Sequence, residues 1–197
     1  EQFVEASRRK LRELLERDLR DLELCAVMID GIRFDGETFV VALGIGCDGR
    51  KLILGLRQGA TENAAVVNEL CGDLEERGLD FQQARLYVLD GAKALANAIR
   101  KRAGEAALIQ RCQLHKRRNV LGHLPEEHQP FIEQKLAAAW AMFDYAEAKK
   151  ALEKVGEELE RINPSAARSL AEGLEETLTI HRLRVPEKLR KTLFSTN

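Results

Sequence analysis

Two aspartates in this chain each follow a short apolar run and each precede a glycine. Asp30 ends "VMID" and is followed by "GIRF", while Asp90 ends "YVLD" and is followed by "GAKAL". Two neighbouring carboxylates repel each other, and burial makes them harder to ionise unless a cation lies between them. Mg²⁺ suits such a pair because it prefers oxygen ligands and keeps positions open for water and phosphate. If Asp30 and Asp90 meet, the pattern therefore indicates a metal centre for phosphoryl transfer.

A local explanation for both aspartates stays open. Asp-Gly is a common turn dipeptide, and this chain also has it at 35–36 and 48–49, where we expect ordinary turns between strands. A turn explains Asp30 poorly, because strand-like residues continue beyond it. Asp90 lies between a strand and a helix, so it could instead be a helix N-cap. Spacing alone does not decide between a metal pair and these local roles.

The stretch "QRCQLHKRRNVLGHLP", residues 110–125, holds a second candidate cluster. Cys112 and His115 have a spacing that suits zinc, but a structural zinc site needs two more ligands, which His123 and His128 could supply only by favourable helix geometry. The alternative is that Cys112 and His115 form a packing or hydrogen-bonding pair next to the acidic site. We then expect the basic residues that follow to face phosphate: Lys116, Arg117 and Arg118.

Basic residues gather in two stretches although the net charge is only −1. Between residues 100 and 118 there are seven Lys or Arg against one acid, Glu105, and "HRLRVPEKLRK" near the C-terminus has five against Glu187. A solvated helix face would explain either stretch alone. Together they favour a polyanionic partner, because Lys and Arg release counterions when they bind a phosphate backbone.

The pattern of apolar residues predicts an α/β fold that would position these side chains. "LELCAVMIDGIRF", "TFVVALGIG" and "KLILGLRQ" are strand-like and separated by Asp-Gly turns, which predicts an antiparallel meander. A helix over 62–77 should follow, with Thr61 as N-cap and Gly78 as its stop. The strand "ARLYVLD", a helix ending at Gly104 and the strand "AALIQRC" complete a mixed sheet in the order β-β-β-α-β-α-β. A right-handed crossover can set the fourth strand beside the first.

The remaining sequence predicts helices and a cytosolic globular protein. From about Leu114 onward the pattern is helical and broken by four prolines, and the first 21 residues read as a charged amphipathic helix rather than a signal peptide. No apolar run is long enough to span a membrane, and 45% apolar with 32% charged residues is typical of a globular core. The four cysteines lack framework spacing, so we expect buried free thiols rather than disulfides.

Five blocks of this sequence resemble the Mutator-like transposases of bacterial insertion sequences. They are "VMIDGIRF", "GIGCDGRKLILGL", "TENAAVVNELCGDLEERGL", "YVLDGAKALANAI" and "IQRCQLHKRRNVLGHLP", in that order. The string "QRCQLHKRRNV" is the most specific of them, and the resemblance runs from about Leu22 to the end of the chain. It implies a ribonuclease H-like core over 22–124, preceded by the helix of 1–21. A helical insertion would cover 125–191, and 192–197 would begin the segment that leads to a third acid.

The resemblance implies an enzyme that cuts DNA at transposon ends and joins the freed 3′ hydroxyl to a target strand. Such enzymes use two aspartates and a glutamate to bind Mg²⁺ or Mn²⁺, with two ions in the complete enzyme. Asp30 would be the first acid and Asp90 the second, while Cys112 and His115 match the family's Cys-x-x-His motif. The partner would be double-stranded DNA in the bacterial cytoplasm, at the nucleoid, bound by a homodimer or larger assembly. The residues expected to contact DNA are Arg111, Lys116, Arg117, Arg118, Asn119, Arg182 and Arg184.

One part of the family pattern is incomplete in these 197 residues. The family motif reads Thr-Asn-x-x-Glu; Thr196 and Asn197 match it, and the glutamate would fall beyond Asn197. The sequence therefore reads as a fragment, which we expect to bind Mg²⁺ weakly and to turn over poorly alone. An alternative is a catalytically inactive, transposase-derived DNA-binding or dimerisation module. A phosphatase with an aspartyl nucleophile is disfavoured, because Ile32 stands where its second acid belongs.

Overall fold

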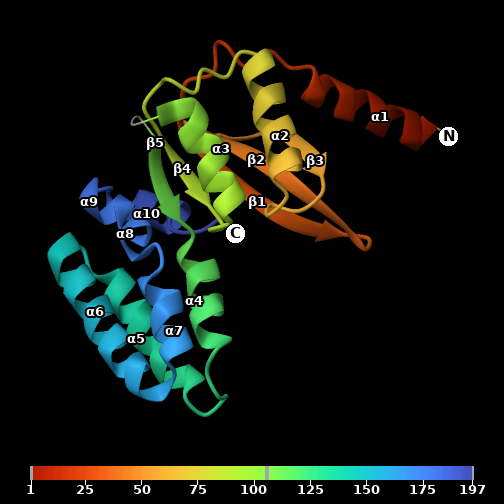
Figure 1. The fold of residues 1–197 in the computed structure, drawn as a ribbon. Coiled ribbons are helices and arrows are strands. Elements are labelled where there is room, and N and C mark those ends of the chain that lie inside the picture. The colour runs from red at the N-terminus through yellow and green to blue at the C-terminus, as the bar shows by residue number, and fades with distance from the viewer. Residues whose placement is uncertain (1, 105–106, 197) are drawn as a thin grey trace. The chain divides into compact units, whose positions relative to one another are not determined.

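The computed structural model describes residues 2–104 and 107–196 (Figure 1). These residues form two compact units, one ending at Leu108 and the other beginning at Ile109, and each is described here by itself. Nowhere in the described ranges is there a helix of sufficient length and apolarity to traverse a lipid bilayer.

The first unit has the order of strands and helices that the apolar pattern predicts. Its elements are α1 (Gln2–Leu15), β1 (Leu24–Phe34), β2 (Glu37–Gly46), β3 (Lys51–Gln58), α2 (Ala64–Glu76), β4 (Arg85–Leu89) and α3 (Lys93–Ala103). The fifth strand, β5 (Ala107–Arg111), continues into the second unit. Of the predicted strand "AALIQRC", Ala106 lies outside the described residues, as does Glu105. The mixed α/β class is confirmed.

The five strands form one mixed sheet in the order β3-β2-β1-β4-β5. β1 pairs antiparallel with β2 and β2 antiparallel with β3, so the predicted meander is confirmed. β4 pairs parallel with β1, which confirms that the fourth strand lies beside the first. Every residue of β4 is buried, as expected for a central strand.

The Asp-Gly dipeptides at 35–36 and 48–49 are turns, as predicted. Asp35 and Gly36 join β1 to β2 and both have positive φ, at 51° and 81°, which is the conformation of the tight hairpin turns that favour this dipeptide. Gly49, with φ 82°, lies between β2 and β3. β1 itself continues through Asp30 as far as Phe34, so a turn does not account for Asp30.

Two helix boundaries differ from the prediction. α1 ends at Leu15 rather than near residue 21, because the chain there turns toward Arg77, whose Nη1 donates to the carbonyl oxygens of Leu14 and Arg17 at 3.3 Å each. α2 is capped by Asn63 and not by Thr61: Asn63 Oδ1 accepts hydrogen bonds from the N–H groups of the first helical turn, and Thr61 is buried. Gly78, with φ 97°, follows the end of α2 as predicted.

The second unit is built from helices after β5. They are α4 (Gln113–Leu121), α5 (Gln129–Ala141), α6 (Tyr145–Ile162), α7 (Pro164–Ala171), α8 (Leu174–Thr177), α9 (Thr179–Arg182) and α10 (Glu187–Leu193). α4 to α7 bury a shared apolar core that includes Val120, Leu136, Leu152, Leu159 and Leu170. Prolines mark the helix starts, with Pro130 in the first turn of α5, Pro164 at the start of α7 and Pro186 just before α10.

The cysteines follow the prediction in part. All four are free, so the absence of disulfides is confirmed. Cys71 and Cys112 are buried, whereas Cys25 and Cys47 are exposed, which corrects the expectation that all four would be buried. Both exposed cysteines lie at the same end of the β1–β2 pair, where the N–H of Cys47 donates to the carbonyl of Glu23.

The cap of α2 supplies a direct test of this local structure. Replacing Asn63 by Ala removes the side-chain acceptor for the N–H groups of Ala65 and Val66, and we expect a loss of about 1 kcal/mol in unfolding free energy. Urea unfolding followed by circular dichroism measures it. Replacing the exposed Glu62 by Ala serves as the control and should change stability by less than about 0.5 kcal/mol. Equal effects of the two substitutions would contradict the assignment of the cap.

Candidate functional site

Asp30 and Asp90 occupy neighbouring positions in the sheet of the first unit. Ile29 pairs with Leu89 in the parallel register of β1 and β4, and each aspartate is the next residue along its strand. The residues before them are almost fully buried, whereas both aspartates are partly exposed. The parallel register of β1 and β4 thus brings the two aspartates to neighbouring positions, Asp30 within β1 and Asp90 directly after β4.

Local hydrogen bonds orient both carboxylates. Asp30 Oδ1 accepts from the N–H of Gly31 at 2.9 Å, and Asp90 Oδ1 accepts from the N–H of Ala92 at 2.8 Å. Asp90 is not the N-cap of α3, because that position belongs to Ala92, which has no side-chain cap. Gly91 between them has φ 104°, a conformation that favours glycine and lets the chain turn sharply from β4 into α3. The Asp-Gly at 90–91 therefore fixes the direction of a carboxylate at a strand end.

Within residues 2–104 and 107–196, no group of three or more His, Cys, Asp or Glu side chains is arranged to hold a metal ion. A metal bound by Asp30 and Asp90 would therefore need further ligands from elsewhere. The zinc interpretation of Cys112 and His115 also finds no third ligand in this part of the chain. Asn197, the last residue of the Thr-Asn match, lies outside the described residues.

Cys112 and His115 in the second unit bind the C-terminal segment of the chain instead. Cys112 Sγ lies 3.5 Å from the buried Ser195 Oγ and accepts a hydrogen bond from the N–H of Thr196 at 3.5 Å. His115 Nδ1 lies 3.4 Å from Thr196 Oγ1, and the N–H of Gln113 donates to the carbonyl of Phe194 at 2.9 Å. The β5–α4 junction and residues 194–196 are thus joined by four contacts, in agreement with a hydrogen-bonding pair.

The same contacts change the acidity of the Cys112 thiol. Burial by itself would raise its pKa, but the hydrogen bonds from His115, Ser195 and the backbone of Thr196 outweigh burial and lower the pKa from 9.0 to about 6. At neutral pH the sulfur is then largely a thiolate, which accepts hydrogen bonds more strongly than a thiol does. The contacts of Ser195 and Thr196 with Cys112 were not predicted from the sequence, because they span more than 80 residues of chain.

Two residues predicted to contact DNA are instead buried and hydrogen-bonded within the second unit. Lys116 is fully buried, and its ammonium donates to the carbonyl oxygens of Ser169 and Glu172 at the end of α7. Burial, followed by the nearby charge of Arg111, lowers the pKa of Lys116 from 10.5 to about 8. Arg111 is also buried; its Nη1 donates to the Glu172 carbonyl at 3.1 Å, and its Nη2 lies 3.6 Å from the Glu172 carboxylate. The expectation that Arg111 and Lys116 face phosphate is wrong.

The other residues of this unit that were predicted to contact DNA are at least partly accessible. Arg118, Asn119, Arg182 and Arg184 are exposed. Arg117 is half-buried and pairs with Glu133 at 3.2 Å. On α4 the side chains at 116 and 120 point into the helical core while those at 118 and 119 point outward, so the helical period, and not the charge, decides which basic residues face solvent.

The chain is similar to transposases along nearly its whole length. The family model described as "Transposase, Mutator family" matches residues 4–197. The transposase for insertion sequence element ISRM5 of Rhizobium meliloti is 34% identical over 82% of this chain and 39% of its own length. The transposase for IS905 of Lactococcus lactis is 30% identical over 82% of this chain and 40% of its own length.

This chain belongs to the Mutator family of transposases. It spans about two fifths to one half of the length of the curated relatives that it matches. The resemblance found in the five sequence blocks is thereby confirmed.

The thiolate of Cys112 predicts a defined pH dependence of stability. The folded-state pKa of Cys112 lies below the ordinary value, so ionisation of its sulfur stabilises the folded state. This stabilisation is complete above pH 9, declines as the pH falls and is lost below about pH 6. The stability difference between the parent chain and Cys112→Ser should therefore grow between pH 6 and 9, by up to about 1.4 kcal/mol per pH unit. Urea unfolding at pH 5.5, 7 and 9 measures it. A difference independent of pH would show that Cys112 is a neutral thiol.

The structural role of Lys116 is tested by removing its charge. Lys116→Met keeps most of the side-chain volume but leaves the Ser169 and Glu172 carbonyls without their donor, which should lower the unfolding free energy by about 1–3 kcal/mol. Arg118→Met, at an exposed position of the same helix, is the matched control and should change stability little. If the two variants unfold alike, Lys116 is not the structural donor described here.

Proposed function

We propose that this chain supplies part of the catalytic core of a transposase that cleaves DNA at transposon ends and transfers the freed strand to a target. Asp30 and Asp90 would hold Mg²⁺ or Mn²⁺ in a ribonuclease H-like core, with two ions in the complete enzyme. The observation that carries the proposal is the parallel register of β1 and β4, in which both aspartates directly follow the paired residues Ile29 and Leu89. Membership of the Mutator family supports the same reaction.

The residues present fit a divalent hard cation. Both donors are carboxylates and both are partly exposed, Asp30 within β1 and Asp90 directly after β4, and each has one oxygen oriented by a backbone N–H. When bound, the metal would activate an attacking oxygen and stabilise the leaving oxygen during phosphoryl transfer. The carboxylates would lose their mutual repulsion, and the buried strands behind them would hold their spacing. The remaining ligands would be water, DNA oxygens or residues outside those described.

DNA would be held by the exposed basic side chains of the second unit. Arg118, Asn119, Arg182 and Arg184 offer donors to phosphate oxygens, and Arg117 could join them if it exchanges Glu133 for a phosphate. Arg111 and Lys116 are excluded from this role by their burial. We further propose that the protein acts on DNA as a homodimer or larger assembly, since two transposon ends must be processed together.

A second candidate function is a non-catalytic DNA-binding or dimerisation module derived from a transposase. The observation that favours it is that the described residues bring together two carboxylates and no third metal ligand. Both candidates predict weak metal binding and poor strand cleavage by residues 1–197 alone. They differ in the longer protein, where the catalytic proposal requires metal-dependent cleavage that depends on Asp30 and Asp90.

Metal binding by the two aspartates is tested with Mn²⁺, whose electron paramagnetic resonance signal reports the free ion. We expect the 197-residue chain to bind Mn²⁺ weakly, and Asp30→Asn or Asp90→Asn to weaken binding by about tenfold or more, since each removes one of two charged ligands. Asp35→Asn, in the β1–β2 turn, is the matched control and should bind as the parent does.

Two further results bear on the proposal. Equal Mn²⁺ affinity for the parent, Asp30→Asn and Asp90→Asn chains would contradict a shared metal site. A full-length protein that cleaves transposon-end DNA with undiminished rate after either substitution would contradict the catalytic assignment of the two aspartates. Loss of cleavage in both variants, with DNA binding retained, is the result that the proposal expects.

A further inference from the structure

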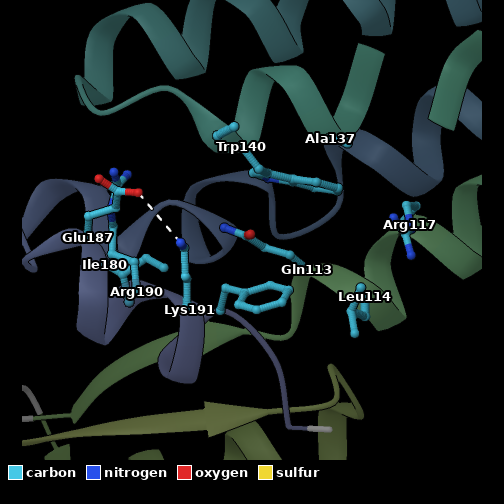
Figure 2. Close-up of a pocket in the computed structure, with 11 residues that line it drawn as sticks. Gln113, Leu114, Arg117, Ala137, Trp140, Ile180, Glu187, Arg190 and Lys191 are labelled. Atoms are coloured by element: carbon cyan, nitrogen blue, oxygen red, sulfur yellow. Dashed lines mark ion pairs between the residues drawn. The ribbon is translucent and has the colours of Figure 1, made fainter. Parts of the chain in front are cut away.

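The second unit contains a cavity of about 280 Å³ whose wall combines aromatic and basic side chains (Figure 2). Trp140 and Phe194 are its aromatic residues and Gln113 contributes an amide. Three lining residues carry positive charge and one carries negative charge: Arg117, Arg190 and Lys191, and Glu187. The cavity lies near the low end of the size range of small-molecule sites, which suits one ring system rather than a larger ligand. The metal-site proposal does not involve this cavity, and Arg117 is the one lining residue that the proposal for DNA contacts also names.

The aromatic and amide groups of this cavity are held in place by the surrounding helices. The indole N–H of Trp140 donates to Thr177 Oγ1 at 3.1 Å, and its backbone carbonyl lies 3.0 Å from His181 Nε2. Gln113 Nε2 donates to the carbonyl of Thr177 at 2.9 Å, while the N–H of Gln113 holds the carbonyl of Phe194. The ring of Trp140 and the amide of Gln113 are therefore pre-organised, which lowers the entropic cost of binding a planar group between them.

The basic residues of the cavity have capacity left for an anion. Arg190 Nη1 donates to the carbonyl of Met142 at 2.9 Å and its guanidinium lies 4.9 Å from the ring centre of Phe143, but its buried Nε has no hydrogen-bond partner among the described residues. Lys191 has one exposed partner, Glu187, at 3.8 Å. A phosphate group would accept hydrogen bonds from guanidinium N–H groups of Arg190 that the Met142 carbonyl does not use, and from the ammonium of Lys191.

We propose that this cavity takes a single unpaired nucleobase of a DNA strand, which stacks on Trp140 while Arg117, Arg190 and Lys191 contact the adjoining phosphates. The proposal rests on DNA being the substrate, as proposed above. A nucleobase meets the aromatic surface and the amide together, and sequence-tolerant stacking combined with a basic groove is how proteins bind single strands. The cations come from two helices, α4 and α10, which suits successive phosphates of a strand better than the single phosphate of a free nucleotide.

The tryptophan content of the chain makes the test specific. Trp140 is the only tryptophan, so its fluorescence reports this cavity alone. The probe is a short abasic DNA strand that carries one adenine, compared with the same strand without any base and with adenosine monophosphate. We expect the single-adenine strand to quench Trp140 and to bind about fivefold or more tightly than the baseless strand, because the phosphates are identical and only stacking differs.

Blocking variants provide a second measurement. Ala137 lines the cavity and Ala138, equally exposed on the same helix, does not, so Ala137→Phe should abolish the preference for adenine while Ala138→Phe keeps it. Circular dichroism melting of both variants checks that they fold. The comparison of the two DNA strands uses the parent chain, so it remains a valid test even if Ala137→Phe does not fold.

Each remaining outcome overturns the proposal in a recognisable way. Equal binding of both strands without quenching means that the chain binds DNA but this cavity holds no base. Binding of adenosine monophosphate as tight as that of the single-adenine strand identifies a free-nucleotide site instead. Binding of neither strand counts against the cavity and also against DNA contacts by this part of the chain, whereas the Mn²⁺ measurement on Asp30 and Asp90 is independent of both.

Discussion

The parallel pairing of β1 with β4 is the constraint on which the candidate metal site depends. Backbone hydrogen bonds between these strands fix the register at Ile29 and Leu89, and the next residue of each strand is an aspartate. The apolar residues before them are removed from water, so a slip of the register would expose several large side chains at once. The hydrophobic core therefore holds two like charges at neighbouring positions, which a divalent cation would stabilise.

The second unit shows how buried polar groups can organise a helical segment. The thiol of Cys112 and the imidazole of His115 bind residues 195 and 196, and Lys116 and Arg111 bind the backbone at the end of α7. Each of these groups is costly to bury unless its hydrogen bonds are satisfied, so together they specify one arrangement of distant segments. The "QRCQLHKRRNV" stretch, although rich in charge, is thus largely a structural element of this unit.

Charge in the sequence was an incomplete guide to the surface of the protein. On α4, Arg118 and Asn119 are exposed while Lys116, within the same basic run, is buried. The run "HKRR" carries no sign of this difference, because the helical period and the position of α7 decide it. Trp140 is part of the helical core and also forms a wall of the cavity.

The amino-acid sequence by itself determined the order of strands and helices, the two hairpin turns with positive φ, and the pairing of β4 with β1. These features follow from local periodicity, glycine conformation and the short list of allowed connections. The tertiary structure decided the end of α1, the partners of Cys112 and His115, and the burial of Arg111 and Lys116. Each of these depends on atoms brought together from distant parts of the chain, such as Arg77 with Leu14, or Cys112 with Thr196. No local pattern encodes such a contact, because its free energy exists only once both segments are folded.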